Sequence, residues 1–139
     1  MNINNRNGHI LIVDDSINNI ELLSDILSDY YEVMFASSGT KALQMAVELL
    51  PGLILLDIVM PEIDGYEMIK ILKNDPATAH IPVIFITAKA TQDDMLKGFK
   101  VGAVDYIAKP FHEEEVCVRV KTHVENQLLI KALAKQFKF

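Results

Sequence analysis

A short apolar run that ends in a single carboxylate is the feature that most constrains how this chain folds. Leu53 to Leu56 are all aliphatic, Asp57 follows them directly, and Pro51 and Pro61 bound the segment. An apolar run of this length between breaker residues predicts a strand that is buried on both faces of a parallel sheet. Asp57 would then lie at the carboxyl end of the strand, the edge at which open α/β sheets bind their ligands. A carboxylate there is either a site residue or the N-cap of the next segment, and both interpretations stay open at this point.

The bulk properties of the chain fit one cytoplasmic domain. It has 139 residues, 50% of them hydrophobic, which is enough to bury a core and argues against disorder. The apolar runs are far shorter than the roughly 20 residues that span a bilayer, and the first residues are polar, so we expect no signal peptide and no membrane segment. The single cysteine, Cys117, fits a reducing cytoplasm as a buried structural thiol. A net charge of -6 argues against direct nucleic-acid binding and is compatible with a cation site.

Strand-like and helix-like segments alternate five times along the sequence. The predicted strands cover residues 9–13, 32–36, 53–57, 83–86 and 104–108. The segments between them carry apolar residues at helical spacing, and a long helix is expected from Glu113 onward. Such alternation predicts a parallel sheet with helices on both faces and right-handed crossovers. We therefore divide the chain into a polar tail (1–8), one α/β domain (9–124) and a C-terminal helical extension or linker (125–139).

Local patterns add detail to three of the expected helices. Asn18 and Glu21 have the spacing of a capping box at the start of the first helix. In the second helix, expected over 41–50, the inward face consists of Ala42, Leu43, Ala46, Val47 and Leu50. The fourth helix, expected from about residue 93, is weaker because Gly98 interrupts it.

Four of the predicted strands end in polar residues that a parallel sheet brings to one edge. Asp14 and Asp15 follow the first strand, Asp57 the third, Thr87 the fourth and Lys109 the fifth. Each alone has an ordinary explanation, namely helix capping, a β-branched strand residue or a solvated loop lysine. Three carboxylates in one pocket repel each other by ~1 to 4 kcal/mol per close pair, and a divalent cation relieves that repulsion. An oxygen-only donor set favours Mg²⁺ or Mn²⁺ over Zn²⁺.

Carboxylates, a magnesium ion, a lysine and a hydroxyl are the groups that phosphoryl transfer needs. The cations neutralise charge on the transferred oxygens while the nucleophile is held in line with the phosphorus. Neither histidine nor cysteine is placed to attack at this edge, so a carboxylate is the predicted nucleophile and an aspartyl phosphate the product. Asp57 is central on the edge and is the predicted acceptor.

The chain also carries an ordered set of short motifs. They are Asp14-Asp15, Asp57 with Met60-Pro61, Asp64-Gly65, Thr87-Ala88, Gly102-Ala103, Tyr106 and Lys109-Pro110-Phe111. Over residues 8–124 this set resembles the receiver domain of two-component response regulators, the family typified by the bacterial chemotaxis regulator. The resemblance implies a flavodoxin-like α/β sandwich with a parallel sheet of strand order 2-1-3-4-5, followed here by an extended C-terminal helix.

The resemblance further implies how the acidic residues act. Asp57 would accept a phosphoryl group from the phosphohistidine of a sensor histidine kinase or a phosphotransfer protein. Asp15, Asp57 and the backbone carbonyl of Val59 would bind Mg²⁺, with Asp14 assisting through water. The chain would be a regulatory phosphoacceptor rather than an enzyme.

A switch is implied as well. Thr87, Ala88 and Lys109 would contact the phosphoryl group, and the peptide bond between Lys109 and Pro110 would be cis. Our hypothesis is that phosphorylation draws Thr87 inward and vacates space that Tyr106 then fills. The fourth helix would repack and change the face that it forms with the fifth strand and fifth helix, where an output domain or partner binds. The C-terminal helix is either a frayed tail or a signalling helix that forms a homodimer contact or joins an output domain.

Two other functions remain as alternatives. A phosphatase or phosphotransferase of the haloacid-dehalogenase type would also use Asp57 as its nucleophile, but it expects an acidic residue where Val59 stands. A phosphate-independent docking module would not need the complete acidic set. If the chain is a receiver, Val59 predicts slow self-hydrolysis of the phosphorylated form, because an apolar side chain cannot hydrogen-bond the attacking water.

Overall fold

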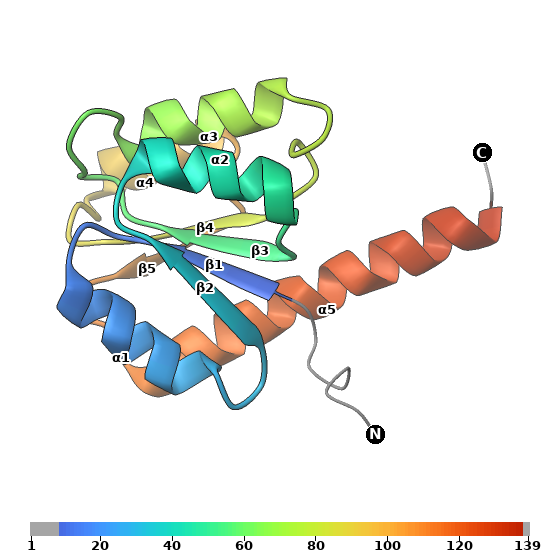
Figure 1. Ribbon diagram of the computed structural model, residues 1–139, viewed down its shortest axis with the longest axis horizontal. Coiled ribbons are helices and arrows are strands. Elements are labelled where there is room, and N and C mark those ends of the chain that lie inside the picture. Colours follow the sequence, from blue (N-terminus) through green and yellow to red (C-terminus); the bar gives the residue numbers. More distant parts are fainter. Residues whose placement is uncertain (1–8, 138–139) are drawn as a thin grey trace.

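The computed structural model describes residues 9–137, in which strands and helices alternate strictly (Figure 1). The strands are β1 (His9–Val13), β2 (Glu32–Ala36), β3 (Leu53–Leu56), β4 (Val83–Thr87) and β5 (Asp105–Ala108). The helices are α1 (Ile17–Leu27), α2 (Gly39–Leu49), α3 (Gly65–Asn74), α4 (Gln92–Val101) and α5 (Glu113–Phe137). The expected polar tail over residues 1–8 lies outside the described residues.

All five strands of the sheet are parallel, in the order β2-β1-β3-β4-β5, which confirms the predicted topology. β3 pairs with β1 on one side and with β4 on the other, so the acceptor strand is central. Helices α1 and α5 cover one face, and α2, α3 and α4 cover the other (Figure 1). The side chains of Leu53 to Leu56 are completely buried, as the aliphatic run predicted. The flavodoxin-like sandwich is therefore confirmed.

Each face of the sheet has its own apolar layer, because alternate side chains of a strand point to opposite faces. Ile10 and Ile12 of β1 pack in the layer under α1 and α5. Leu11 and Val13 of the same strand pack in the layer under α2 and α3. With both faces of β1 buried, a shift of register would move every side chain to the wrong layer. This packing holds the carboxyl ends of the strands at one edge.

Three local predictions are wrong. The N-cap of α1 is Ser16, whose Oγ accepts the backbone N–H three residues on at 3.3 Å, so Asn18 lies inside the first turn. Val47 and Leu50 are 51% and 50% exposed, because α2 lies on the sheet through two small alanines and leaves longer side chains at its flank. Cys117 is half-buried on α5 rather than buried.

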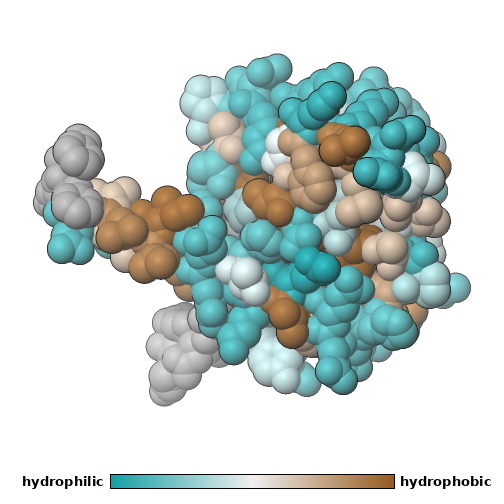
Figure 2. All heavy atoms as spheres, turned by 180° about the vertical axis from the view of Figure 1, so that it is seen from behind, coloured by the Kyte–Doolittle hydropathy of each residue, from teal (hydrophilic) through white to brown (hydrophobic). Residues whose placement is uncertain are grey.

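Helix α5 continues beyond the part that covers the sheet. Val124 is buried, and Gln127 Nε2 donates to the carbonyl oxygen of His80 at 3.0 Å, in the segment before β4. The following turns project away from the sheet (Figure 1), and there Leu129 and Ile130 are 58% and 52% exposed. Figure 2 shows apolar surface gathered on this projection. Across residues 9–137, no helix has the length and apolar character needed to cross a bilayer.

Candidate functional site

Three carboxylates meet where β1 and β3 end. Asp14 and Asp15 follow β1, and Asp57 follows β3. Backbone hydrogen bonds extend the sheet past the strand ends, since the Asp57 N–H donates to the Val13 carbonyl at 2.9 Å and the Asp14 N–H to the Ala36 carbonyl at 3.2 Å. One carboxylate oxygen from each of the three aspartates lies within 4.8 Å of the others. The structure thus brings together the three acidic residues that the sequence pointed to.

Lys109 reaches this acidic cluster from the end of β5. Its Nζ donates to Asp14 Oδ2 at 2.8 Å and to Asp57 Oδ2 at 2.9 Å. Asp14 is completely buried and Asp57 is 6% exposed, so both ion pairs are poorly solvated. Burial lowers the pKa of Lys109, but the hydrogen bonds and charges of the two aspartates outweigh it, and the pKa is raised overall. The Lys109–Pro110 bond is cis, the isomer that the family resemblance implies.

The acidic cluster has the donor chemistry of a hard divalent cation site. Asp15 is exposed, while Asp14 Oδ1 accepts the Ser16 N–H at 2.9 Å and Asp57 Oδ1 accepts the Val59 N–H at 3.4 Å. Three carboxylates with oxygen donors only suit Mg²⁺ or Mn²⁺ better than Zn²⁺. The exposure of Asp15 leaves room for the waters that Mg²⁺ usually retains.

Thr87 and Ala88 lie at the end of β4, on the same edge. Thr87 is completely buried and pairs in register with Ala108 of β5, one residue before the site lysine. Its Oγ1 accepts the Lys89 N–H at 3.2 Å, and its carbonyl accepts the Lys109 N–H at 2.9 Å. Ala88 is exposed, and it lines a groove together with Lys109.

Tyr106 of β5 faces inward in this structure. It is 5% exposed, and its ring centroid lies 5.5 Å from that of Phe85. Its hydroxyl donates to the Lys89 carbonyl at 3.0 Å. Burial, and next the neighbouring hydroxyl of Tyr66, raise the pKa of Tyr106 far above its usual value. This inward position is the one that the switch hypothesis gives to the phosphorylated form.

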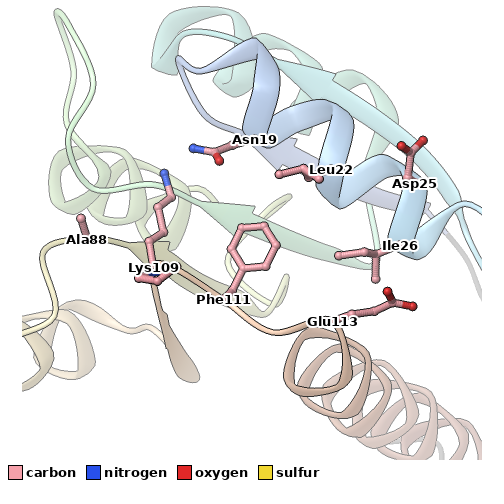
Figure 3. Close-up of a pocket in the computed structure, with 9 residues that line it drawn as sticks. Asn19, Leu22, Asp25, Ile26, Ala88, Lys109, Phe111 and Glu113 are labelled. Atoms are coloured by element: carbon pink, nitrogen blue, oxygen red, sulfur yellow. The ribbon is translucent and has the colours of Figure 1, made fainter.

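A groove opens between α1 and the segment that follows β5 (Figure 3). Its volume is ≈ 710 Å³, and its apolar lining includes Leu22 and Ile26 of α1 and Phe111 beside the cis bond. Lys109 lies at one end of the groove and Glu113 at the other (Figure 3). Sequence reasoning missed this groove. The available signal was Leu22, an aliphatic residue off the inward stripe of α1 that is 54% exposed.

The sequence matches the family described as response regulator receiver domain over residues 10–121. The chain belongs to this family. It is 48% identical over 118 residues to a probable cyclic di-GMP phosphodiesterase of Vibrio cholerae, and this match covers 85% of this chain and 27% of that protein. It is 40% identical over 130 residues to the response regulator PleD of Caulobacter vibrioides, which covers 93% of this chain and 29% of that protein. The signal receiver domain of a histidine kinase from Syntrophus aciditrophicus aligns with a TM-score of 0.79 at 34% identity, covering 86% of this chain and 91% of that one.

Membership of the receiver family establishes the class of function. This receiver domain acts in phosphorylation-based signalling, and its family is regulatory. The chain spans less than a third of the length of the two curated relatives, 27% and 29%, so their names describe much larger proteins. The family match supports a regulatory receiver.

Proposed function

We propose that Asp57 is the phosphoacceptor and that its donor is the phosphohistidine of a sensor histidine kinase or a phosphotransfer protein. The observation that carries this proposal is the contact between the Lys109 ammonium and Asp57 Oδ2 at 2.9 Å, within a cluster of three carboxylates. Phosphoryl transfer gathers charge on oxygens near the nucleophile, and a positioned cation stabilises that charge. Lys109 also reaches Asp14, but Asp14 is completely buried, whereas Asp57 follows the central strand β3 and keeps a small exposed fraction.

In the proposed step, a carboxylate oxygen of Asp57 attacks phosphorus and the bond from phosphorus to the imidazole nitrogen breaks. The electron pair of that bond stays on the nitrogen. The donor leaves as neutral imidazole, because its other ring nitrogen carries a proton. The phosphoryl group ends as an acyl phosphate on Asp57, and Lys109 moves from the carboxylate to a phosphoryl oxygen.

Asp15, Asp57 and the backbone carbonyl of Val59 are the proposed ligands of Mg²⁺, with Mn²⁺ as the alternative ion. Asp14 would act through water, as the family resemblance implies, and its carboxylate is the one that is completely buried among the three. A divalent cation held there would neutralise charge on the phosphoryl oxygens. Support comes from the oxygen-only donor set and its spacing of 4.8 Å or less.

Thr87 is the proposed link between the acceptor and α4. Its Oγ1 would turn from the Lys89 N–H to a phosphoryl oxygen, with Ala88 beside it, and the loop to α4 would repack against Tyr106. Thr87→Ala should therefore abolish the change in α4 amide chemical shifts on phosphorylation. Thr78→Ala is the matched control, because it removes an almost equally buried hydroxyl after α3 and should leave that change intact. A full response in Thr87→Ala would show that the hydroxyl does not carry the signal.

The groove beside α1 is the proposed docking site for the donor protein. It opens next to Lys109, so a protein that brings a phosphohistidine to Asp57 must cover it. Its apolar lining, Leu22, Ile26 and Phe111, suits the apolar face of a partner helix.

Two other surfaces are proposed for output. The face of α4, β5 and α5 carries Phe99 and Val118, which are 44% and 63% exposed and would bind an output domain or partner. On the projecting part of α5, Leu129, Ile130 and Leu133 share one stripe at helical spacing, and we propose it as a homodimer contact. The proposed location is the cytoplasm, and the proposed activity is limited to self-catalysed phosphotransfer and dephosphorylation.

Incubation with Mg²⁺ and a small acyl phosphate, followed by intact mass measurement, tests the acceptor. One adduct of about 80 mass units, a single phosphoryl group, should form on the wild type and on Asp29→Asn, an exposed aspartate at the end of α1. Asp57→Asn should not form it. An adduct that persists in Asp57→Asn would place the phosphate elsewhere. Multiple turnover of the acyl phosphate would favour an enzyme, and no adduct on the wild type would favour a phosphate-independent docking module.

A further inference from the structure

Two tyrosine hydroxyls converge on one backbone carbonyl at the start of α4. Tyr66 Oη donates to the Asp94 carbonyl oxygen at 3.2 Å. Tyr106 Oη, which bonds the Lys89 carbonyl, also lies 3.4 Å from the Asp94 oxygen. The two tyrosines come from α3 and β5 and are 4% and 5% exposed. Asp94 also completes the capping box of α4 with Thr91, so the shared carbonyl belongs to the turn that begins the helix.

Tyr66 is fixed to the backbone of the proposed acceptor through its neighbour Gly65. The Gly65 N–H donates to the Ile58 carbonyl at 2.7 Å. A Cβ at Gly65 would lie 2.6 Å from the Asp57 carbonyl oxygen, so no other residue fits without a backbone shift. The first turn of α3 therefore lies directly against Asp57, and a movement of the acceptor backbone moves Tyr66 with it.

Helix α4 lies close to the same group of rings because of Gly98. A Cβ there would lie 2.8 Å from the Tyr106 ring and 3.0 Å from the Phe85 ring. This close approach explains why α4 runs through Gly98 without the interruption that the sequence predicted. Phe85 packs against both tyrosines, with ring centroids 5.6 Å from Tyr66 and 5.5 Å from Tyr106. One residue before Gly98, Lys97 Nζ lies 4.3 Å from the Tyr66 ring centroid and adds a second contact between that ring and the helix.

We infer that Tyr66 is a positioning residue of the switch, and that its hydroxyl ties the first turn of α4 to the acceptor loop in parallel with Tyr106. The inference rests on the proposed function, in which α4 repacks when Asp57 is phosphorylated. Tyr66 donates to the Asp94 carbonyl and Tyr106 donates to the nearby Lys89 carbonyl, so loss of the Tyr106 contact alone leaves the helix tied through Tyr66. Release of α4 then requires movement of the loop after β3 as well, which makes the helix respond to the acceptor and not to the Tyr106 ring alone.

Amide hydrogen exchange of the unphosphorylated full chain tests this tie directly. Tyr66→Phe keeps the ring and removes the hydroxyl, and the loss of one net hydrogen bond corresponds to exchange that is about 2- to 12-fold faster at the amides of residues 95–98. Tyr31→Phe is the matched control, since Tyr31 is 5% exposed but packs on the other face of the sheet, and it should leave these amides unchanged. The double variant Tyr66→Phe/Tyr106→Phe should exceed the product of the two single effects, because each single variant keeps one hydroxyl bonded at the start of α4 and the double variant keeps neither.

The outcomes separate a local tie from a general structural role. Unchanged exchange in Tyr66→Phe, or a uniform rise over the whole domain, would overturn the inference. A double variant that equals the product of the single effects would also overturn it, since the hydroxyls would then act independently. Failure of the wild type to form the phosphoryl adduct would refute the proposed acceptor, whereas the exchange comparison in the unphosphorylated chain would still decide the role of Tyr66.

Discussion

Replacement of Lys109 by methionine removes the ammonium group that contacts the acidic cluster while keeping a long apolar side chain. Nζ lies 2.8 Å from Asp14 Oδ2 and 2.9 Å from Asp57 Oδ2. In the variant these two carboxylates and Asp15 would face one another with no cation between them. The cluster would then repel itself unless a divalent ion is added.

The expected loss follows from distance and burial. At an effective dielectric constant of 20, one unit-charge pair at 2.9 Å is worth about 6 kcal/mol before desolvation and side-chain entropy are counted. Measured losses on breaking a buried pair are about 3 to 5 kcal/mol. The Lys109 side chain is 17% exposed, so we expect the lower limit, a fall of about 3 kcal/mol in the free energy of unfolding without divalent cation. Added Mg²⁺ should recover part of this loss, because a ligand of the folded state alone stabilises it.

Urea unfolding at pH 7, followed by circular dichroism with a chelator and then with magnesium chloride, measures both effects. Lys89→Met is the matched control, because the Lys89–Asp94 pair spans 3.6 Å and the lysine side chain is 48% exposed. Its loss should stay below about 1 kcal/mol. Equal losses in the two variants without cation would refute the electrostatic account of the site. So would magnesium that stabilises Lys109→Met no more than the wild type.

Three further predictions concern other parts of the domain. Gly65→Ala should destabilise the fold by about 3 kcal/mol in urea unfolding, because its Cβ would meet the Asp57 carbonyl at 2.6 Å. Gly52→Ala, whose nearest contact is 3.5 Å, should change stability by less than about 1 kcal/mol, and equal losses would contradict the steric reasoning. Burial raises the pKa of Asp105, but hydrogen bonds from α5 and the backbone outweigh it, so the pKa is lowered overall. The ionised Asp105 side chain therefore stabilises the fold fully only at pH values above the pKa of an aspartate in the unfolded chain, about 3.9. The stability difference between wild type and Asp105→Asn should therefore shrink as the pH falls through the folded pKa, and a constant difference down to pH of about 2 would contradict this. Val59→Asn should shorten the lifetime of the phosphoryl adduct in a mass-spectrometric time course, since its amide can hydrogen-bond the attacking water, and an unchanged decay would count against that role.

The parts of the fold with local determinants were predictable from the sequence. The aliphatic run before Asp57 predicts a strand buried on both faces, and β3 is such a strand. The alternation of strands and helices predicts a parallel sheet, and a parallel sheet alone brings Asp14 and Lys109 to one edge although 95 positions separate them. The order of the strands has no local determinant, because it depends on pairing between distant segments. The family resemblance, and not the pattern of residues, predicted it.

The features that were missed depend on contacts that no local pattern encodes. Ser16 and Asn18 are both good caps, and only the path of the chain after β1 selects Ser16. Val47 has the spacing of an inward residue, but α2 touches the sheet along a narrow line. Gly98 has the character of a helix breaker in the sequence, whereas in the structure a side chain at this position would clash with the rings that lie beneath α4. The Tyr66 hydroxyl has a partner 28 positions away, which spacing along one element cannot reveal.

The length of helix α5 amplifies small rotations at its first turn into larger displacements at its distant end. Its 25 residues span about 37 Å, from just beyond the cis bond at Lys109 to the turns that project away from the sheet. A tilt of about 5° at its first turn sweeps the distant end through roughly 3 Å. A displacement too small to disturb the packing around Val120 thus grows with distance from the pivot, and it is largest at the exposed apolar stripe near Leu133.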